Sequence, residues 1–592
     1  MKQVIILTPD SNGLLQPKDD KDYLLPLVNM YGFDINNIKS NNISTLKNQF
    51  NQFDYTLLSS KLSVQISKKI SLLIFKSDNE KYLPIYLDTI RFFVEILLSK
   101  ILKLDQINNY READIFPSKN TYEFNYSIDN RYMAYRIGYL NQNFQWAVLR
   151  ILIGAKDKII INDLKIKLRQ KLKILSFYYI NRLKTLMPMK KNLVLMGPSL
   201  KRLDSLNKLK INTLKEKNLL IQKFKNSKCQ IKRKKIMNII NEELISALGN
   251  TYYNNNSLLI YSKIISELLS TSIIEDGKMN IIFYEKYVKK NKFKAYLSIG
   301  SYLKEYIHSN FMTVACKLNN VPVLTVQHSG LIGYEKVMPK FFTSDMLMAD
   351  FYLSAGWKEY PNEYSECDVK AKILPLPNPY FSELKKIGLK RDFSNRKKTV
   401  LIPVSKFVTL DEKIGSNSSD DNIEILRNFI IEFINNIEDY FDKIIVIYRS
   451  NNFESDPLYK FLKSKKNKIN ILSNSNIKPV ELFSEVDLVV WDVTSTGFVE
   501  SLSYGLPTIG LLNKNRWSSN AYYYIDKLVS NKILHYNAKS ASESAVLMVQ
   551  DHNNWIKYFR NISVFLDKFI YTEDNWIEKW EKFFYELDFT NS

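Results

Sequence analysis

The most regular pattern in this 592-residue chain lies between residues 399 and 512, where short apolar runs alternate with amphipathic stretches. The apolar runs predict buried strands, whereas the stretches repeat apolar residues at helical spacing and predict helices. The predicted strands cover residues 399–405, 443–450, 469–473, 487–492 and 507–512, and the predicted helices 423–437, 479–486 and 498–505. Because the loops between them are short, this order predicts a doubly wound parallel sheet.

The first 380 residues carry a less regular pattern of the same kind. Predicted strands cover residues 3–9, 55–60, 279–284, 321–326, 351–356 and 372–377, and residues 82–102 predict a long helix. Pro375, Pro377 and Pro379, followed by the charged stretch 388–398, indicate a connection between domains. We therefore expect one domain over residues 1–380 and a second over residues 381–550.

Residues 551–592 are rich in aromatic side chains at three- and four-residue spacing. This spacing predicts helices with one buried face. We expect these C-terminal helices to pack back on the body of the protein.

Positive charge is concentrated between Lys156 and Lys235. This segment holds 24 Lys and Arg residues against four acidic ones, so it carries +20 of the net charge of +23. We expect a basic, largely helical insertion at about residues 156–250. The charge fits either a solvated surface or attraction to a polyanion: anionic lipid head groups, a lipid-linked acceptor or nucleic acid. Nucleic acid is least favoured, because no nucleic-acid-binding motif accompanies the charge.

Part of the basic segment has features of a membrane-binding helix. Its leucines at 164, 168 and 172 recur at helical spacing, and Phe177, Tyr178 and Tyr179 suit a membrane interface. Residues 164–174 also alternate between apolar and polar, so a strand is the alternative.

Cysteine content and hydropathy indicate the cellular compartment. The three cysteines are isolated from one another, which argues against a disulfide framework or a structural zinc site and favours a reducing cytoplasm. The chain begins without a signal-peptide pattern and contains no apolar run of about 18 residues. We expect a cytoplasmic protein, either soluble or peripheral on the inner face of the cytoplasmic membrane.

In doubly wound sheets, ligands bind beyond the carboxyl ends of the strands. Asp492 ends one predicted strand, and Thr494, Ser495 and Thr496 open the next helix. Hydroxyl groups and the unpaired N–H groups of a helix N-terminus suit a phosphate, and Glu500 lies one turn farther on, within reach of ribose hydroxyls. The alternative is that Ser495 or Thr496 is an ordinary N-cap. The hydroxyl cluster behind an aspartate favours the anion site.

Other strand ends offer further candidates for binding a nucleotide. Ser405 and Lys406 follow the predicted strand 399–405, where loop amides and an ammonium group could face the same anion. Arg449 ends the predicted strand 443–450, and a guanidinium there suits a phosphate or carboxylate, although a structural salt bridge is nearly as well supported. Asn378 ends another predicted strand and is a candidate ligand or a turn residue.

One of only four histidines follows the apolar run 321–326. Gln327, His328, Ser329 and Gly330 stand where this predicted strand ends, and the glycine lets a ligand approach the backbone closely. Near neutral pH, an imidazole can act as a general base for an acceptor hydroxyl or as a cation beside a leaving phosphate. A structural role is the usual one for a single histidine. Three acidic residues could orient His328 or replace it as base, or could be surface charges: Glu335, Asp345 and Asp350.

Three phrases in fixed order, QHSGLIGYE, ADFYLSAGW and DVTSTGFVESLSYGLPTIGLL, precede the tryptophan-containing C-terminal helices. Together they resemble a family of transferases found in bacterial O-antigen and surface-carbohydrate loci, from about Asn310 to the end of the chain. That family has glycine where Ser329 stands. The resemblance implies an α/β, GT-B-like fold: two Rossmann-like domains facing a cleft, with the basic helical insertion and C-terminal helices that cross back. It makes residues 1–380 the acceptor side and residues 381–550 the nucleotide-sugar side.

A more distant similarity suggests residue roles. The order of strand-end motifs is similar to that of CDP-alcohol phosphotransferases of teichoic-acid type and of transferases that use CMP-linked sialic-type or Kdo-type sugars. In those enzymes a histidine faces the reacting centre and a hydroxyl pair binds the nucleotide phosphate. The similarity implies these roles for His328 and for Ser495 with Thr496, and a looser match for Ser405.

The function predicted from the sequence is a metal-independent glycosyltransferase of surface-polysaccharide assembly. Its catalytic residues would be His328 and Asp345, its co-substrate a nucleotide-activated sugar, favoured to be a CMP-linked acidic sugar, and its acceptor lipid-linked or a glycan. No cofactor or metal is expected. One alternative is a CDP-alcohol phosphotransferase that uses the same site, and another is a non-catalytic scaffold at the membrane.

Overall fold

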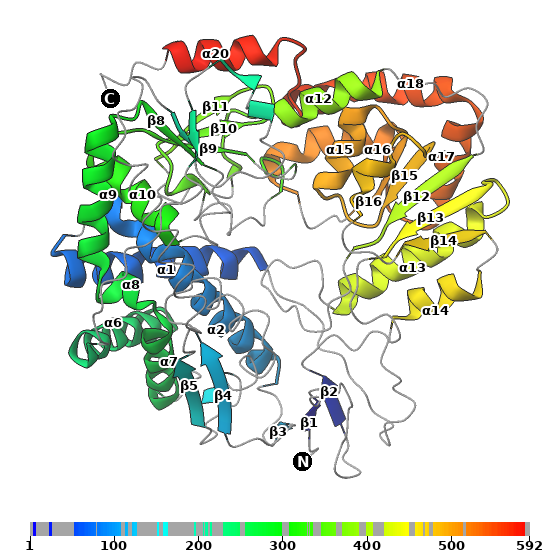
Figure 1. Ribbon diagram of the computed structural model, residues 1–592. Coiled ribbons are helices and arrows are strands. Elements are labelled where there is room, and N and C mark those ends of the chain that lie inside the picture. Colours follow the sequence, from blue (N-terminus) through cyan, green and yellow to red (C-terminus); the bar gives the residue numbers. More distant parts are fainter. Residues whose placement is uncertain are drawn as a thin grey trace, which may run out of the picture.

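Figure 1 shows the computed structural model of the chain. The described residues are 4–7, 23–26, 52–77, 80–107, 113–115, 121–126, 148, 151–152, 158–163, 194–196, 205–206, 208–210, 213–215, 229–248, 255–298, 307–327, 330, 332–335, 345–362, 370–389, 398–405, 420–448, 456–465, 468–472, 477–512 and 517–586.

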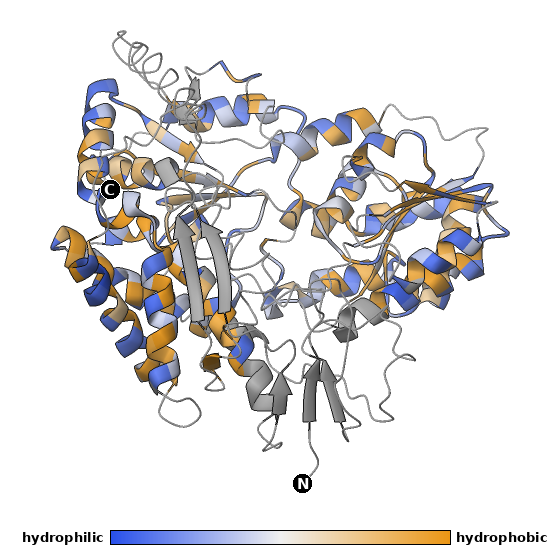
Figure 2. Ribbon diagram, turned by 60° about the horizontal axis from the view of Figure 1, so that its bottom comes forward, coloured by the Kyte–Doolittle hydropathy of each residue, from blue (hydrophilic) through white to orange (hydrophobic). Residues whose placement is uncertain are grey.

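The C-terminal half, called the second unit, contains a six-stranded parallel sheet, called the second sheet. Its order is β14-β13-β12-β15-β16-β17. Numbered along the chain, this order is 3-2-1-4-5-6, that of the Rossmann fold. Helices cover both faces, so the central strands are apolar throughout, as the orange strands of Figure 2 show. The strands are β12 (Thr399–Pro403), β13 (Lys443–Ile447), β14 (Ile469–Leu472), β15 (Leu488–Trp491), β16 (Thr508–Leu511) and β17 (Leu534–His535).

The connections of this second sheet are helical. Three of them contain the helices predicted at 423–437, 479–486 and 498–505, whereas the helices at 457–464, 522–530 and 538–550 were not predicted. In α13, for example, buried residues recur at Phe429, Ile430, Phe433, Ile434 and Ile437. The helices are α13 (Asp420–Ile437), α14 (Pro457–Ser464), η7 (Pro479–Leu482), α15 (Thr496–Tyr504), η8 (Ser519–Ala521), α16 (Tyr522–Ser530) and α17 (Ala538–Gln550).

The other half of the molecule, called the first unit, contains another six-stranded parallel sheet, called the first sheet. Its order is β11-β10-β9-β8-β6-β7. Numbered along the chain and read from β7, this order is 2-1-3-4-5-6, also doubly wound. The predicted fold class, α/β with two Rossmann-like units, is confirmed by these two strand orders. The strands of this first sheet are β6 (Val194–Met196), β7 (Thr213–Lys215), β8 (Ala295–Ser298), β9 (Val323–Val326), β10 (Phe351–Ser354) and β11 (Lys372–Pro375).

Two smaller parallel sheets lie outside these units. One has the order β2-β1-β3 and the other pairs β4 with β5. Their strands are β1 (Val4–Leu7), β2 (Tyr23–Pro26), β3 (Ala113–Ile115), β4 (Thr121–Tyr126) and β5 (Lys158–Asp163).

A helical layer packs against one face of the first sheet and shares a hydrophobic core with Tyr296 and Val323. The helices of this half are α1 (Gln52–Phe75), η2 (Glu80–Ile85), α2 (Leu87–Ile107), α6 (Gln230–Leu248), α7 (Asn255–Leu268), α8 (Thr271–Ile274), α9 (Gly277–Asn291), α10 (Ile307–Leu318) and α12 (Pro379–Gly388). None of the helices in the described part of the chain is both long and apolar enough to cross a bilayer.

Two strand predictions in this half were wrong. Residues 55–60 lie in α1 and residues 279–284 in α9. In both cases the short apolar run is part of a longer helical pattern: Leu62, Ile66 and Ile70 continue it in α1, and Tyr287 and Val288 continue it in α9. Six residues are too few to distinguish the two periods.

The insertion expected to be largely helical at about residues 156–250 contains three strands as well as a helix where it is described. It contributes β5, and its strands β6 and β7 belong to the first sheet. Helix α6 is the helical part that the structure describes. Residues 164–186, for which helix and strand were both open, lie outside the described residues.

Helices at the C-terminal end connect the two large sheets, as the fold prediction expected. They are α18 (His552–Asn561), α19 (Ser563–Phe569) and α20 (Trp576–Glu586). Trp555 of α18 donates to the carbonyl of Gly505 in the second unit (2.9 Å). Trp576 and Trp580 of α20 pack on the other face of the first sheet, against Leu297 and Leu324, and Figure 1 shows α20 above that sheet.

His535, at the end of β17, makes the stability of the second unit dependent on pH. Its ring nitrogens lie 3.1 Å from Ser540 Oγ and 2.9 Å from the Lys532 carbonyl, and burial lowers its pKa to about 4. The unfolded chain therefore takes up this proton first as the pH falls below about 6.5. We expect the folded state to lose roughly 3 kcal/mol relative to the unfolded state between pH 7 and pH 4.

Urea denaturation of a His535→Gln variant measures this contribution. The variant should lose less stability than the wild type over the same pH interval, whatever its stability at pH 7. His552→Gln on α18, where the histidine is half-buried, is the matched control and should keep the wild-type dependence. An unchanged dependence in His535→Gln would show that another group causes it.

Candidate functional site

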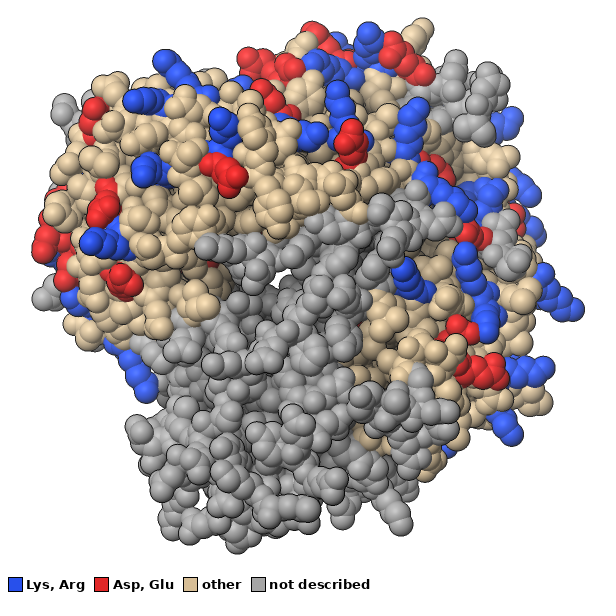
Figure 3. Space-filling view, turned by 180° about the vertical axis from the view of Figure 1, so that it is seen from behind, with Lys and Arg blue, Asp and Glu red and all other residues tan. Residues whose placement is uncertain are grey.

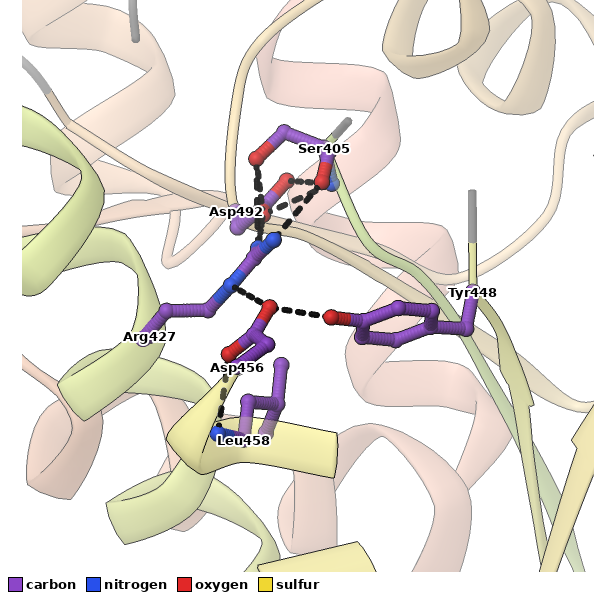
Figure 4. Close-up of polar contacts among 6 residues, drawn as sticks. All are labelled: Ser405, Arg427, Tyr448, Asp456, Leu458 and Asp492. Atoms are coloured by element: carbon purple, nitrogen blue, oxygen red, sulfur yellow. Dashed lines mark hydrogen bonds and ion pairs between the residues drawn. The ribbon is translucent and has the colours of Figure 1, made fainter. Parts of the chain in front are cut away.

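The strand order of the second sheet reverses between β12 and β15, and doubly wound sheets bind ligands beyond such a point. Ser405, two residues after β12, and Asp492, directly after β15, meet there (Figure 4). The Ser405 hydroxyl donates to Asp492 Oδ2 (2.7 Å), and the Ser405 main-chain N–H donates to the same atom (2.8 Å). Asp492 therefore fixes the loop that begins at Ser405.

Arg427 of α13 lies beneath this pair, and its side chain is fully buried. Its Nη2 donates to the Ser405 carbonyl (3.1 Å), and its Nη1 lies 3.5 Å from Asp492 Oδ2. Its Nε donates to Asp456 Oδ2 (3.0 Å). One guanidinium thus joins two buried carboxylates and a main-chain carbonyl, an arrangement for which its planar set of donors is suited.

Asp456 extends the network to the next strand. It is the N-cap of α14, where its Oδ1 accepts from the N–H of Leu458 (2.9 Å). Its Oδ2 accepts a short hydrogen bond from the hydroxyl of Tyr448, the residue that follows β13. Because Asp456 also contacts Arg427, the ends of β12, β13 and β15 are held by one buried network (Figure 4).

Burial decides the direction of two pKa shifts in this network. Loss of hydration raises the pKa of Asp492, while the charge of Arg427 and the hydrogen bonds from Ser405 oppose that rise. Burial, and then the charge of Asp456, raises the pKa of Tyr448, so its hydroxyl remains a donor. The network is a rigid support for the strand ends.

The residues after Asp492 form a tight turn into α15. Ser495 is the N-cap, and its Oγ accepts from the N–H of Gly497 (3.3 Å), so the capping role that the sequence left open is real. A Cβ on Gly497 would lie 2.1 Å from the ring of Trp491, so this position requires glycine. The Thr494 side chain is buried. The turn is packed too tightly to shift without disturbing β15.

Gln327, at the end of β9 in the first sheet, binds main-chain and side-chain groups of the protein. Its Oε1 accepts from the Ala355 N–H (2.9 Å) and from Trp357 Nε1 (2.7 Å), and its Nε2 donates to the Ile332 carbonyl (3.3 Å). These bonds join the segments that follow β9 and β10. Gln327 therefore fixes Ile332 relative to Ala355 and Trp357.

Gly330 brings this loop into contact with α15 of the second unit. A Cβ at Gly330 would lie 2.7 Å from Val499 Cβ, so the glycine backbone rests directly on that helix. A few residues later, the N–H of Ser518 donates to the carbonyl of Tyr334 (2.9 Å). The segment after β9 therefore adjoins the helix that Ser495 caps.

The Gly330–Val499 contact can be tested by a double-mutant cycle. Gly330→Ala should destabilise the protein because the new methyl group overlaps Val499, and Val499→Ala should destabilise it by leaving space. In the double variant the two Val499 methyl groups that overlap the new side chain are absent, although the Cβ of residue 499 remains, so the combined loss should be smaller than the sum by about 1 kcal/mol. Additive losses in urea denaturation would contradict the contact.

Three other predicted residues have defined positions. Asn378 is the N-cap of α12, accepting from the N–H groups of Tyr380 (3.0 Å) and Phe381 (3.1 Å). Asp345 is fully buried and precedes β10. The pKa of Tyr352 is raised first by the burial of Tyr352 and then by the charge of Asp345. Glu500 is buried within α15.

Comparison with known sequences identifies the family. The sequence profile described as LIC12162 family transferase matches residues 41–584. The chain belongs to this family. The transferase part of the resemblance drawn from the sequence is confirmed by this match.

Other comparisons add little to the family assignment. No curated protein sequence matches this LIC12162 family transferase. Solved structures with some likeness include S. aureus MnaA with UDP (13% identity, 68% of this chain and 99% of that chain, TM-score 0.35). UDP-GlcNAc 2-epimerase from Methanocaldococcus jannaschii has 14% identity (66% and 98%, TM-score 0.37), and the N-terminal domain of Candida albicans trehalose-6-phosphate phosphatase 9% (68% and 98%, TM-score 0.34). Scores this low support no inference about substrate.

The structure brings together some of the residues predicted for this LIC12162 family transferase. Ser405 and Asp492 are hydrogen-bonded, residues 494–496 continue from Asp492, and Gly330 contacts α15. Asn378 lies elsewhere, at the start of α12, where its N–H donates to the Tyr571 carbonyl. His328, Ser329, Lys406 and Arg449 lie outside the described residues, so their roles stay predictions.

The sequence analysis missed Arg427, Tyr448 and Asp456. A signal for Arg427 exists, because it occupies a position of α13 that the helical spacing of Ile430 and Ile434 assigns to the core. Asp456 followed by Pro457 has the pattern of a helix start. Within the described ranges, no three His, Cys, Asp or Glu side chains come together as metal ligands.

Proposed function

We propose that this LIC12162 family transferase transfers a sugar from a nucleotide-activated donor to an acceptor of bacterial surface-polysaccharide assembly. The family match supports group transfer as the reaction class. The single structural observation that carries the proposal is the Gly330–Val499 contact, which joins the loop after β9 to the helix that follows the switch point of the other sheet. Groups from both units can therefore serve one reaction.

The donor phosphates would bind at the carboxyl ends of β12, β13 and β15. Lys406 and Arg449, which adjoin the described ends of the first two strands, supply positive charge, and the start of α15 supplies main-chain N–H groups. The buried Arg427 network holds the ends of these three strands together. His328, two residues from Gly330, is the proposed catalytic base, and Asp345 the acid that assists it.

In this mechanism the acceptor hydroxyl oxygen forms a bond to the anomeric carbon, and the bond from that carbon to the donor phosphate oxygen breaks. His328 takes the hydroxyl proton. The nucleotide leaves with the bonding electron pair, and Lys406, Arg449 and the α15 N-terminus stabilise its charge. The scheme requires no metal ion.

The favoured donor is a CMP-linked acidic sugar, because the basic excess of the chain suits anionic substrates. The acceptor would be a lipid-linked molecule or a glycan, and the site of action the cytoplasm or the inner face of the cytoplasmic membrane. The basic segment 156–235 is a candidate for contact with an anionic membrane surface.

A thermal-shift panel of CMP, CDP, UDP and GDP tests the donor. A nucleotide that binds only the folded protein adds about 2.7 kcal/mol at a hundredfold excess over its Kd. We expect stabilisation by CMP, reduced in Ser495→Ala. Stabilisation by UDP alone would exclude the CMP-linked donor, and no stabilisation by any of the four would count against a nucleotide donor.

Product analysis tests the reaction itself. Transfer of a sugar releases the nucleotide monophosphate from a CMP-sugar, whereas a phosphotransferase acting on a CDP-alcohol leaves a new phosphodiester that phosphorus NMR detects. His328→Ala should abolish sugar transfer while nucleotide binding persists. Polysaccharide assembly that is unchanged by His328→Ala and Ser495→Ala would instead indicate a non-catalytic scaffold.

A further inference from the structure

The N-terminal turns of α6 and α9 are fixed side by side by a buried ion pair. Arg233 of α6 donates from Nε and Nη2 to the carboxylate of Glu275, two residues before α9 (both 2.9 Å). The N–H of Cys229 donates to the same carboxylate (3.0 Å), and Arg233 also contacts the carbonyls of Ser266 and Leu269. Both members of the pair are buried. The two helix starts therefore form one rigid unit.

Three apolar side chains near the starts of these two helices are exposed to water. Ile231 is 73% exposed, Met279 47% and Ile282 44%. On α6, Lys234 and Lys235 share the face of Ile231, and on α9 Lys278 shares the face of Ile282, because residues three and four apart are neighbours on a helix. We call these six residues the α6–α9 patch: Ile231, Lys234, Lys235, Lys278, Met279 and Ile282.

Positively charged side chains outnumber acidic ones around the α6–α9 patch. Glu275 is neutralised by Arg233, Asp276 is buried at the N-cap of α9, and Glu285 on α9 lies 4.0 Å from Lys289. Figure 3 shows Lys and Arg side chains, with some acidic ones among them, on the flank that α6 and α9 form, at the right of that view. The patch also stands at the end of the basic segment, since Lys235 is its last residue.

This combination identifies the kind of partner. Exposed aliphatic side chains flanked by lysines suit the boundary between lipid head groups and acyl chains, where lysines meet anionic head groups and the apolar groups leave water. Nucleic-acid-binding surfaces use lysine as well as arginine to contact phosphates, but they contact bases mainly with polar and aromatic side chains rather than with exposed aliphatic ones. No arginine or aromatic side chain is exposed on the described residues of α6 and α9.

We propose that the α6–α9 patch docks the protein on an anionic lipid bilayer. The lysines attract the head groups, and Ile231, Met279 and Ile282 enter the interface. The Arg233–Glu275 ion pair already holds the starts of α6 and α9 together, so binding does not cost the entropy of ordering these segments. The inference goes beyond the proposed sugar transfer, and membrane binding can be measured without turnover, so either can fail alone.

Co-sedimentation of the full chain with vesicles tests the docking. The probes are vesicles of phosphatidylcholine alone and of phosphatidylcholine mixed with phosphatidylglycerol. We expect binding to the mixed vesicles that weakens with added salt. A Lys234→Ser, Lys235→Ser, Lys278→Ser variant should lose about fivefold in partition coefficient per lysine. An Ile231→Ser, Met279→Ser, Ile282→Ser variant should lose about tenfold, because its apolar groups no longer leave water.

Matched substitutions on the second unit serve as controls: Lys443→Ser, Lys460→Ser and Lys539→Ser together, and Ile425→Ser, where the isoleucine is 57% exposed. These should bind as the wild type does, and melting temperatures should confirm that every variant is folded. Wild-type binding in both patch variants would overturn the proposal and assign lipid attraction to another part of the chain. Equal binding to both kinds of vesicle would overturn it too, as would patch-dependent binding to a DNA duplex without binding to vesicles.

Discussion

Replacing Gly388 with alanine is expected to cost about 4 kcal/mol of stability. Gly388 is the last residue of α12, and its backbone lies against the end of α15 from the other unit. A Cβ at this position would lie 1.7 Å from the carbonyl oxygen of Tyr504. Main-chain atoms of a buried helix end cannot move aside as a flexible side chain does, so the two helices must separate. Urea denaturation at neutral pH measures the loss.

Gly277→Ala is the matched control for this substitution. Gly277 is also at a helix terminus, and a Cβ there would meet the ring of Phe75 at 3.4 Å, an ordinary contact. Its stability should change by less than about 1 kcal/mol. Similar losses for the two variants would mean that the approach of α12 to α15 is not the cause.

Replacing Arg427 with methionine is expected to destabilise the protein by about 4 kcal/mol. The substitution keeps most of the side-chain volume but removes the cation that contacts Asp456 and Asp492, both of which remain buried. Breaking a buried ion pair from one side costs roughly 3–5 kcal/mol, because a charge is left without compensation. Denaturation in urea at pH 7 gives the value.

Two further variants separate the ion network from simple loss of an arginine. Arg560→Met on the exposed face of α18 should change stability by less than about 0.5 kcal/mol. Adding Asp492→Asn to Arg427→Met should restore part of the lost stability, because it removes one of the two buried carboxylates that Arg427→Met leaves without a counter-ion. A double variant that is less stable than Arg427→Met would show that Asp492 stabilises the fold mainly through Ser405.

The second sheet could be predicted from the sequence almost strand for strand. Its strands are buried on both faces and therefore read as uninterrupted apolar runs, such as Val400, Leu401 and Ile402. The first sheet was harder to predict, because its short strands lie among helices that contain equally short apolar runs. The residues at 279–284 were misread for this reason. Strand order depends on contacts between distant segments, which periodicity does not encode.

The candidate site could be predicted where a residue's position follows from its strand. Ser405 and Asp492 both end strands of one parallel sheet, so their meeting follows from the fold. The roles of Gln327 and Asn378 could not be predicted, because a carboxamide is equally suited to a ligand and to main-chain groups. Arg427 was missed because it reaches the strand ends from a helix that covers the sheet.

Helix α20 has a consequence for how the chain matures on the ribosome. The first sheet is translated long before Trp576 and Trp580, yet these side chains cover one of its faces. Until they emerge, Leu297 and Leu324 remain open to water or to chaperones. The amino-terminal unit therefore cannot complete its folding before α20 has been translated, although domains generally fold in the order of their synthesis.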